Sequence, residues 1–330
     1  MAVSVLIMSD PHHAGPAEQA RRGYELAVAP NWPVRQLLRA YRGLYWQRDP
    51  LGNGRFLAEF LRRAPDADFV VANGDYSADS AFIGVADDGA FASAAECLAR
   101  LRGRFGAKFH ATIGDHELGK TSLVGGQGGL RLASWPRTVN ELALRPCWQI
   151  EWQRYVLLGV TSTLLALPLL LREAPAAEHA AWEQLRAEHL AAVRAAFAGL
   201  HAEQRVLLFC HDPTALPFLA ELPEVAARLG QIEATVIGHL HSELILRKSR
   251  LLAGLPPIRW FGVSVGRMST ALHRAKQWRP FNVRLCPSLT GIQLLKDGGW
   301  LTVELDSDAR HPAKFRCHRL PWSEVGPLAP

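Results

Sequence analysis

Cysteine is scarce in this chain, and its spacing is not that of a disulfide or metal framework. The 330 residues include five scattered cysteines with no CxxC motif: Cys97, Cys147, Cys210, Cys286 and Cys317. An odd, unclustered set argues against a disulfide framework and against a structural zinc site. We therefore expect reduced thiols, mostly in the core, and a cytoplasmic location.

Long hydrophobic runs are also scarce. The apolar start of the chain is short, follows no basic segment and stops at Asp10, so we expect no signal peptide. One run, residues 155–171, is 17 residues long, which is the lower limit for a membrane-spanning helix. Because glycine, proline and hydroxyl residues interrupt it, we interpret 155–163 as a buried strand followed by an apolar loop or short helix. We predict no transmembrane span, and peripheral membrane contact stays open.

The charge balance favours an anionic partner only weakly. There are 37 basic and 31 acidic residues, a net charge of +6. This excess suits a small anionic substrate but does not by itself indicate nucleic-acid binding, and we expect none. Hydrophobic content of 48% is ordinary for a soluble globular protein, and the length suffices for one large α/β domain or two domains.

Short apolar runs alternate with helical patterns along the chain. Runs rich in Val, Ile, Leu and Phe predict strands buried on both faces at 3–8, 69–72, 109–113, 206–210 and 234–237. Apolar residues at helical spacing predict helices at 56–61, 91–105 and 182–200. This alternation predicts an α/β layered architecture.

Two segments resemble insertions in a single domain spanning 1–330. The first, 14–54, interleaves aromatic residues with arginine, and the second, 164–177, is mostly Leu, Ala and Pro. From about residue 255 we expect a β-rich part. It would have strands at 258–265, 291–295 and 300–305, a turn at 297–299 and a loosely packed tail over the last 25 residues.

A short polar motif follows each of the five predicted strands. In order, the motifs are Asp10-Pro11-His12, Gly74-Asp75, Gly114-Asp115-His116-Glu117, His211-Asp212 and Gly238-His239-Leu240-His241. Carboxylates and imidazoles are ligands of divalent metals, and ligands of open α/β sheets gather at the carboxyl ends of strands. We assign the Gly, Pro and Leu of these motifs no role. The ordered set predicts a two-metal hydrolase.

The same motif order resembles that of the calcineurin-like metallophosphoesterases, over roughly residues 1–242. The resemblance implies an α/β fold of four layers, an α-β-β-α sandwich of two packed mixed β-sheets flanked by helices. It implies a first metal held by Asp10, His12, Asp75 and His241. It implies a second metal held by Asp115, His211 and His239, with Asp75 bridging the two. His116 would be catalytic, facing the phosphoryl oxygen or the leaving group.

The resemblance also implies two divalent metal ions per chain, manganese being favoured over iron, zinc, nickel or magnesium. Two such ions acidify a bridging water, and the resulting hydroxide attacks phosphorus in line. The leading hypothesis is therefore a dinuclear-metal phosphoesterase acting on a phosphodiester or pyrophosphate linkage rather than on a phosphoprotein. The protein phosphatase branch usually has an arginine near the position of Asp75, and residues 76–80 contain none.

Two positions depart from the family pattern. Asp115 stands where the family usually has Asn, which adds a negative charge to the ligand set and should soften the metals' Lewis acidity. Ala78 stands where a second Asp often orients the catalytic histidine, and Asp79 lies one residue late. Among neighbours of the motifs, we expect His13 to face solvent or to support a ligand. Glu117 and Asp212 are each open between supporting a ligand and capping a helix or turn.

Several alternatives stay open. The arginine-rich 267–284 stretch is either a solvated face or an anion-binding rim. The aromatic insert 14–54 and the leucines of 164–171 could together cap the metals, which would suit a nucleotide- or lipid-linked substrate. A UDP-diacylglucosamine-type pyrophosphate hydrolase is the second hypothesis and a DNA phosphoesterase the third. The fourth is a non-catalytic metal-binding scaffold, against which the complete ligand set and His116 argue.

Overall fold

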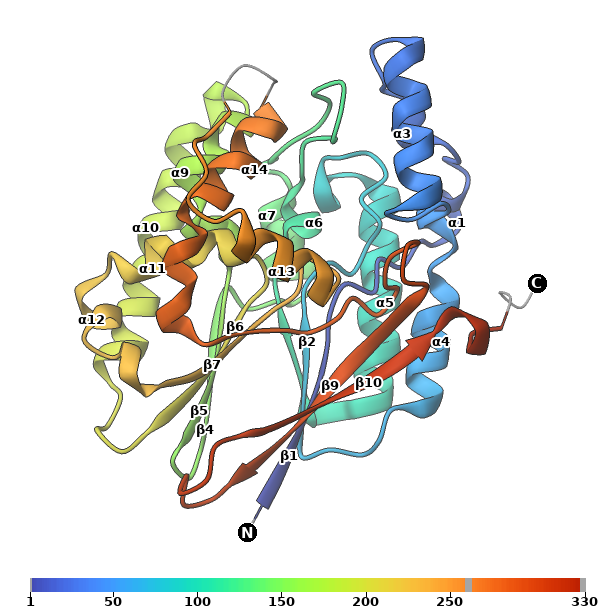
Figure 1. The fold of residues 1–330 in the computed structure, drawn as a ribbon. Coiled ribbons are helices and arrows are strands. Elements are labelled where there is room, and N and C mark those ends of the chain that lie inside the picture. Colours follow the sequence, from blue (N-terminus) through green and yellow to red (C-terminus); the bar gives the residue numbers. More distant parts are fainter. Residues whose placement is uncertain (1, 259–262, 327–330) are drawn as a thin grey trace.

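The computed structural model, which describes residues 2–258 and 263–326, contains two mixed β-sheets packed face to face. The first sheet has the strand order β10-β9-β1-β2-β3 and the second β4-β5-β6-β7-β8. Figure 1 shows α4 and α5 beside the first sheet and α10, α11 and α12 beside the second. The α/β fold of two packed mixed sheets flanked by helices, predicted from the sequence, is therefore confirmed.

The strands are mostly short, and each sheet combines parallel and antiparallel pairs. The first sheet is formed by β1 (Ala2–Met8), β2 (Phe69–Asn73), β3 (Phe109–Thr112), β9 (Asp297–Asp306) and β10 (Lys314–Pro321). The second is formed by β4 (Cys147–Trp152), β5 (Tyr155–Val160), β6 (Arg205–Cys210), β7 (Ile232–Ile237) and β8 (Val283–Leu285). Strands β1 to β3 are parallel, as are β5 to β8, so each set ends at one edge of its sheet.

The helices vary from single turns to five-turn segments. Those of the first half are α1 (Pro16–Gln19), α2 (Tyr24–Ala27), α3 (Trp32–Leu44), α4 (Gly54–Arg63), α5 (Asp88–Phe105), α6 (Asp115–Leu118) and α7 (Ser134–Pro136). Those of the second are α8 (Ser162–Leu165), α9 (Leu167–Leu170), α10 (His179–Ala198), α11 (Leu216–Ala220), α12 (Pro223–Ala226), α13 (Glu243–Leu251) and α14 (Val263–Arg274). The three helices predicted by periodicity correspond to α4, α5 and α10.

Burial on both faces explains why the strands appear as continuous apolar runs. In β1, Val3, Val5 and Ile7 join residues of β5, β6 and β9 in the core between the sheets. The alternate residues Leu6 and Met8 join the core that includes the buried faces of α4 and α5. Since neighbouring side chains of a strand point to opposite faces, a central strand that is covered on both faces, such as β1, is apolar at nearly every position.

The prediction for the C-terminal part was partly wrong. Residues 263–265, expected in a strand, begin α14, while 259–262 lie outside the described residues. Residues 291–295 form a turn rather than a strand, and the expected loose tail contains β10. A short β-branched run carries too little information to choose its partner, and tertiary packing overrides its propensity. Only the expected strand at 300–305 is confirmed, as part of β9.

The predicted turn at Asp297-Gly298-Gly299 is instead the start of β9. A Cβ atom on Gly298 would collide with the Leu289 carbonyl oxygen, and one on Gly299 would collide with the His318 carbonyl oxygen. These glycines therefore allow two backbone segments to approach β9 closely, which is a common role of glycine within a strand.

The apolar run at 155–171 enters the core rather than a membrane. It forms β5, then α8 and α9, and most of its leucines are fully buried. Within residues 2–258 and 263–326, no helix has the length and apolar character needed to cross a bilayer.

His189 of α10 gives the fold a defined sensitivity to acid. Its Nε2 accepts a hydrogen bond from the Thr161 amide, 3.2 Å away, just after β5. Burial lowers the pKa of His189 to about 4. Below the ordinary histidine pKa of about 6.5 the unfolded chain takes up a proton that the folded chain does not, so stability falls as the pH drops towards 4.

We predict that His189→Gln, which cannot titrate, flattens this dependence. Between pH 6.5 and pH 4, wild-type protein should lose roughly 3 kcal/mol more unfolding free energy than the variant does. Urea melts at several pH values measure the difference. His201→Gln, at an exposed position, should follow wild type. Identical pH slopes for wild type and His189→Gln would contradict the assignment.

Candidate metal centre

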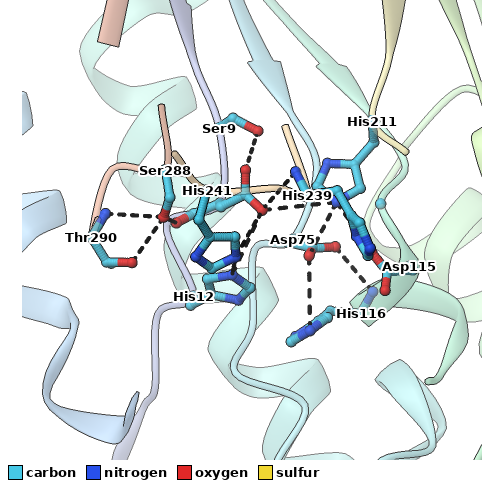
Figure 2. A network of polar contacts seen from close by, with 12 residues as sticks. Ser9, His12, Asp75, Asp115, His116, His211, His239, His241, Ser288 and Thr290 are labelled. Carbon is cyan, nitrogen blue, oxygen red and sulfur yellow. Dashed lines mark hydrogen bonds and ion pairs between the residues drawn. The ribbon is translucent and has the colours of Figure 1, made fainter. Parts of the chain in front are cut away.

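The carboxyl edges of the two sheets meet, and the predicted motifs lie together there. Asp10 and His12 follow β1, Asp75 follows β2, and Asp115 and His116 lie in α6 after β3. From the second sheet, His211 follows β6, and His239 and His241 follow β7. Figure 2 shows the labelled histidines of this set, with Asp75 and Asp115, converging from both sheets. Every residue predicted from the motifs as a metal ligand is in this cluster.

The ligand-type atoms form two main groups. Asp10, His12 and His241 make one, in which Asp10 Oδ1 lies 3.4 Å from His241 Nε2. Asp75, Asp115, His211 and His239 make the other. In it, His211 Nε2 lies 3.1 Å from an oxygen of Asp75 and 3.1 Å from one of Asp115.

Asp75 lies between the two groups. Besides its place with Asp115, it forms a third set with His12 and His116. The ligand atoms within each set lie within 4.8 Å of one another. This is the position in which one carboxylate could reach two ions.

The backbone bends sharply to aim these side chains at one point. Five of the seven predicted ligand residues have positive φ: Asp10 (52°), His12 (41°), Asp75 (62°), His239 (50°) and His241 (60°). This left-handed region is uncommon for residues other than glycine and costs on the order of 1 kcal/mol or more at each position. Such strain clusters at functional sites and persists only where the surrounding structure enforces it.

The glycines that precede the ligands, to which the motif analysis gave no role, are required by close packing. A Cβ on Gly74 would lie 2.7 Å from His211 Nδ1, and one on Gly238 would lie 2.5 Å from Asp10 Oδ2. Gly114 would likewise collide with the Asp75 carboxylate. A glycine directly before a candidate ligand residue recurs three times in the sequence, and this recurrence could have indicated the close packing.

The protonation pattern fits metal ligands. The Nδ1 of His211 contacts the Asn73 carbonyl at 2.5 Å, so this nitrogen carries a proton and Nε2 is the nitrogen that faces the cluster. That Nε2 is fully buried and lies 3.1 Å from an oxygen of Asp75 and 3.1 Å from one of Asp115. Although burial opposes the charged ring, Asp75 and Asp10 hold the pKa of His211 well above its usual value, and a bound divalent cation would replace the proton on this nitrogen. The two Nε2 atoms of His12 and His241 face each other at 3.1 Å. Converging lone pairs of this kind fit a bound cation.

Burial sets the charge states further. Burial, with a contribution from nearby His116, lowers the pKa of His12 to about 3, which keeps the ring neutral and available as a ligand. Burial raises the pKa of Asp10 to about 6. Although burial opposes ionisation of Asp115 too, Lys120 and His239 hold the pKa of that carboxyl well below its usual value. The donor set therefore suits divalent cations, which require neutral imidazoles and ionised carboxylates.

His116 is oriented by a backbone carbonyl rather than by a carboxylate. Its Nδ1 lies 3.1 Å from the Ser77 oxygen, and its Nε2 lies 3.8 Å from Asp75 Oδ2. Asp79, whose role was open, accepts a hydrogen bond from the Gly84 amide and lines the cavity described below. Ser77 carries no side-chain signal for this role, because only its carbonyl acts.

Neighbouring polar residues support the loops. Glu117 is fully buried and accepts hydrogen bonds from the backbone amides of Asp75, Tyr76 and Gly114, so it both caps α6 and fixes the Asp75 loop. Asp212 caps the turn at Thr214 and lies 3.8 Å from His239.

His13 points elsewhere. It is buried rather than facing solvent, and its Nε2 lies 3.2 Å from Glu96 of α5.

A cavity of about 480 Å³ opens over the cluster. His12, His116, His239 and His241 line its polar end. Aromatic residues of the 14–54 segment form part of its wall, including Tyr41, Tyr45 and Trp46. The Trp46 ring lies 4.6 Å from that of His241. The expectation that the 14–54 segment caps the cluster is thus matched by its position.

The expectation for the leucine-rich segment was wrong. None of the residues 164–171 lines the cavity, and Leu164, Leu165 and Leu167 are buried in the core. Of the arginine-rich stretch 267–284, the described lining includes Arg267, whose Nη1 lies 2.5 Å from Glu173 Oε1. The leucine-rich run at 164–171 fits a core helix as well as a cap, and only tertiary packing distinguishes the two.

Comparisons with known proteins give distant likenesses. No family model matches the chain, and no curated protein matches it significantly. The phosphopantetheinyl hydrolase of Mycobacterium tuberculosis is 16% identical over 84% of this chain and 91% of its own, with a TM-score of 0.37.

Two further solved structures are similarly remote. A conserved uncharacterised protein of Streptococcus pneumoniae, titled a predicted phosphoesterase, is 10% identical over 96% of this chain and 99% of its own, with a TM-score of 0.29. The NAD nucleotidase of Haemophilus influenzae is 11% identical over 96% of this chain and 49% of its own, with a TM-score of 0.28. Scores this low transfer no function, so a function must be argued from the site itself.

We predict that Gly238→Ala disrupts the cluster, because the added methyl group would displace Ser9 and Asp10. Bound manganese, measured by plasma mass spectrometry after dialysis, should fall at least about tenfold, since a displacement of the carboxylate by about 1 Å removes a ligand. Gly230→Ala is the matched control, since nothing lies within 4 Å of its added Cβ. Full metal content in Gly238→Ala would show that this packing is not required.

Proposed function

We propose that this chain is a metal-dependent phosphoesterase that cleaves a phosphodiester or pyrophosphate linkage. The observation that carries the proposal is the meeting of two ligand groups, one from the Asp10 side and one from the His211 side, at the floor of one cavity. Neither group is a chance surface cluster, because most of its members are buried and their backbones are strained.

In this proposal Asp10, His12 and His241 hold one divalent ion, and Asp115, His211 and His239 hold a second. Asp75 would reach both, which is supported by its membership of sets on either side. When bound, the two ions would polarise the phosphoryl group and acidify a water molecule for attack on phosphorus. Manganese stays the favoured metal, as the mixed oxygen and imidazole donors suit it.

His116 would act on the leaving group. Because the Ser77 carbonyl can only accept a hydrogen bond, it keeps a proton on Nδ1 and leaves Nε2 as the nitrogen that exchanges one with substrate. An imidazolium at the cavity floor would stabilise developing charge or protonate the leaving oxygen.

The shape of the cavity supports a substrate larger than a simple phosphate monoester. Its volume falls in the range of pockets that bind whole small molecules. Aromatic residues Tyr41, Tyr45 and Trp46 lie on one side, and apolar residues of α13 and α14 on another. A phosphodiester with an aromatic or apolar substituent would place its phosphate at the histidines and its substituent against these walls.

Metal-dependent diester cleavage is the first prediction of this proposal. Metal-stripped enzyme reloaded with manganese should hydrolyse bis-p-nitrophenyl phosphate faster than p-nitrophenyl phosphate. Asp75→Ala should abolish turnover and lower bound metal. His116→Ala should keep its metal and lose turnover by about 10²–10⁴-fold, the usual contribution of an acid–base group.

Asp66→Ala is the carboxylate control, since that side chain is 87% exposed and pairs only with Arg104 among the described contacts. Its activity should equal wild type. If wild-type enzyme binds manganese yet turns over neither compound, the scaffold hypothesis gains and catalysis of simple phosphoesters is contradicted.

The wall of the cavity makes a second prediction. Trp46→Ala should lower kcat/KM for bis-p-nitrophenyl phosphate about tenfold, because one lost aromatic contact is worth about 1.4 kcal/mol. The value for methyl p-nitrophenyl phosphate, which has the same leaving group, should change little. The ratio of kcat/KM for the two esters cancels any effect that the substitution has on the metals, because such an effect would lower both values equally.

Trp32→Ala, at an exposed position at the start of α3, should leave that ratio unchanged. Equal losses on both esters in Trp46→Ala would mean that Trp46 supports His241 rather than the substrate.

A further inference from the structure

A lysine that the motif pattern did not identify lies against the candidate metal centre. The Lys120 Nζ is 2.7 Å from Asp115 Oδ2. Its side chain is 29% exposed and lines the cavity. A lysine and a carboxylate this close, and mostly shielded from water, form a charge-assisted hydrogen bond.

The two oxygens of Asp115 face different partners. Oδ1 lies 3.1 Å from His211 Nε2 and 3.0 Å from His239 Nδ1, within the ligand group. Oδ2 faces Lys120 instead. With one oxygen held by the lysine, Asp115 can offer only the other to a cation.

The chain places Lys120 by a tight turn. Asp115 begins the single-turn helix α6, and Gly119 ends it with φ of 101° and an amide that donates to the Asp115 carbonyl. A side chain on Gly119 would collide with the Gly129 carbonyl oxygen. Next, the Thr121 amide donates to Glu173 Oε2, and Glu173 pairs with Arg267. The turn is thus fixed on both sides of Lys120.

The charge of Lys120 balances that of Asp115. Three carboxylates, Asp10, Asp75 and Asp115, lie in the ligand groups. Arg267 also lines the cavity, but its charge is matched by Glu173. The net charge of an aspartate paired with a lysine is zero, as for a single amide ligand. The pair also offers one oxygen to a cation, as an amide does.

We propose that Lys120 is a positioning residue that neutralises Asp115 and restricts it to one metal-facing oxygen. The inference rests on the proposed metal-dependent function. It predicts that the site depends on the net charge of the Lys120–Asp115 pair rather than on the identity of either side chain. Changing one partner should therefore shift manganese affinity and lower turnover. Changing both in a matched way should restore both quantities.

The test is a double-mutant cycle with a binding readout. Manganese affinity of metal-stripped enzyme is measured by calorimetry for wild type, Lys120→Met, Asp115→Asn and the double variant. Lys120→Met removes a positive charge and should tighten manganese binding about tenfold, while Asp115→Asn leaves the lysine unmatched and should weaken it about tenfold. The double variant should return to within about threefold of wild type.

Turnover of bis-p-nitrophenyl phosphate should instead fall in each single variant and recover in the double variant. Lys120→Met should lower kcat, because the extra negative charge reduces the metals' pull on the phosphoryl group, and the double variant should recover it. Lys120→Arg keeps the charge and should retain manganese affinity. Lys108→Met is the control, since Lys108 directly precedes β3, at the end of that strand away from the cluster, and its Nζ donates to the Ala67 carbonyl. Thermal melts verify that every variant folds.

Losses of kcat that multiply in the double variant, or a manganese affinity that Lys120→Met leaves unchanged, would overturn the proposal. So would a Lys120→Met variant that binds manganese normally but has a raised KM that Asp115→Asn does not correct, because Lys120 would then bind substrate. If wild-type protein binds no manganese, the proposed function itself fails. Manganese binding and turnover in wild type, with kcat losses that multiply in the double variant, would reject only the role of Lys120.

Discussion

The repulsion among three nearby carboxylates is the constraint around which this structure is organised. Asp10, Asp75 and Asp115 lie almost fully buried at one edge of the two sheets. Uncompensated charges in such a place would cost several kcal/mol each. Lys120 offsets the charge of Asp115 in the protein itself, and divalent cations would complete the compensation.

The loops that carry the ligands are also bound to one another. The Asp10 amide donates to the Gly74 carbonyl, the His12 amide to the Asp75 carbonyl, and the Gly238 amide to the His211 carbonyl. These bonds extend the parallel strand pairing beyond the regular strands of each sheet. They hold the ligand residues in left-handed conformations that an isolated loop would leave. The strain of the site is therefore offset by the sheets beneath it.

The cavity above the cluster is assembled from segments far apart in the chain. Its aromatic wall comes from the 14–54 segment, and other walls come from α13 and α14. The Gln293 and Leu294 amides donate to the carbonyls of Trp46 and Tyr45, which fixes the aromatic segment against the C-terminal part. In the proposed function, the selection of substrate would thus rest on these wall segments and the metal chemistry on the cluster at the edge of the sheets.

The sequence by itself determined the layers and the ligand-type residues. Runs apolar at every position mark strands buried on both faces, as in β1 and β6, and polar motifs after such runs must meet at a sheet edge. Only the tertiary structure decided how these residues are used. The contact of the Ser77 carbonyl with His116 and those of His211 Nε2 with Asp75 and Asp115 join distant segments. The pairing of Lys120 with Asp115 depends on the turn at Gly119, which packing against Gly129 holds in place. The leucines of 164–171 and the short runs after residue 255 misled prediction, because their apolar patterns fit several partners and packing alone selects one.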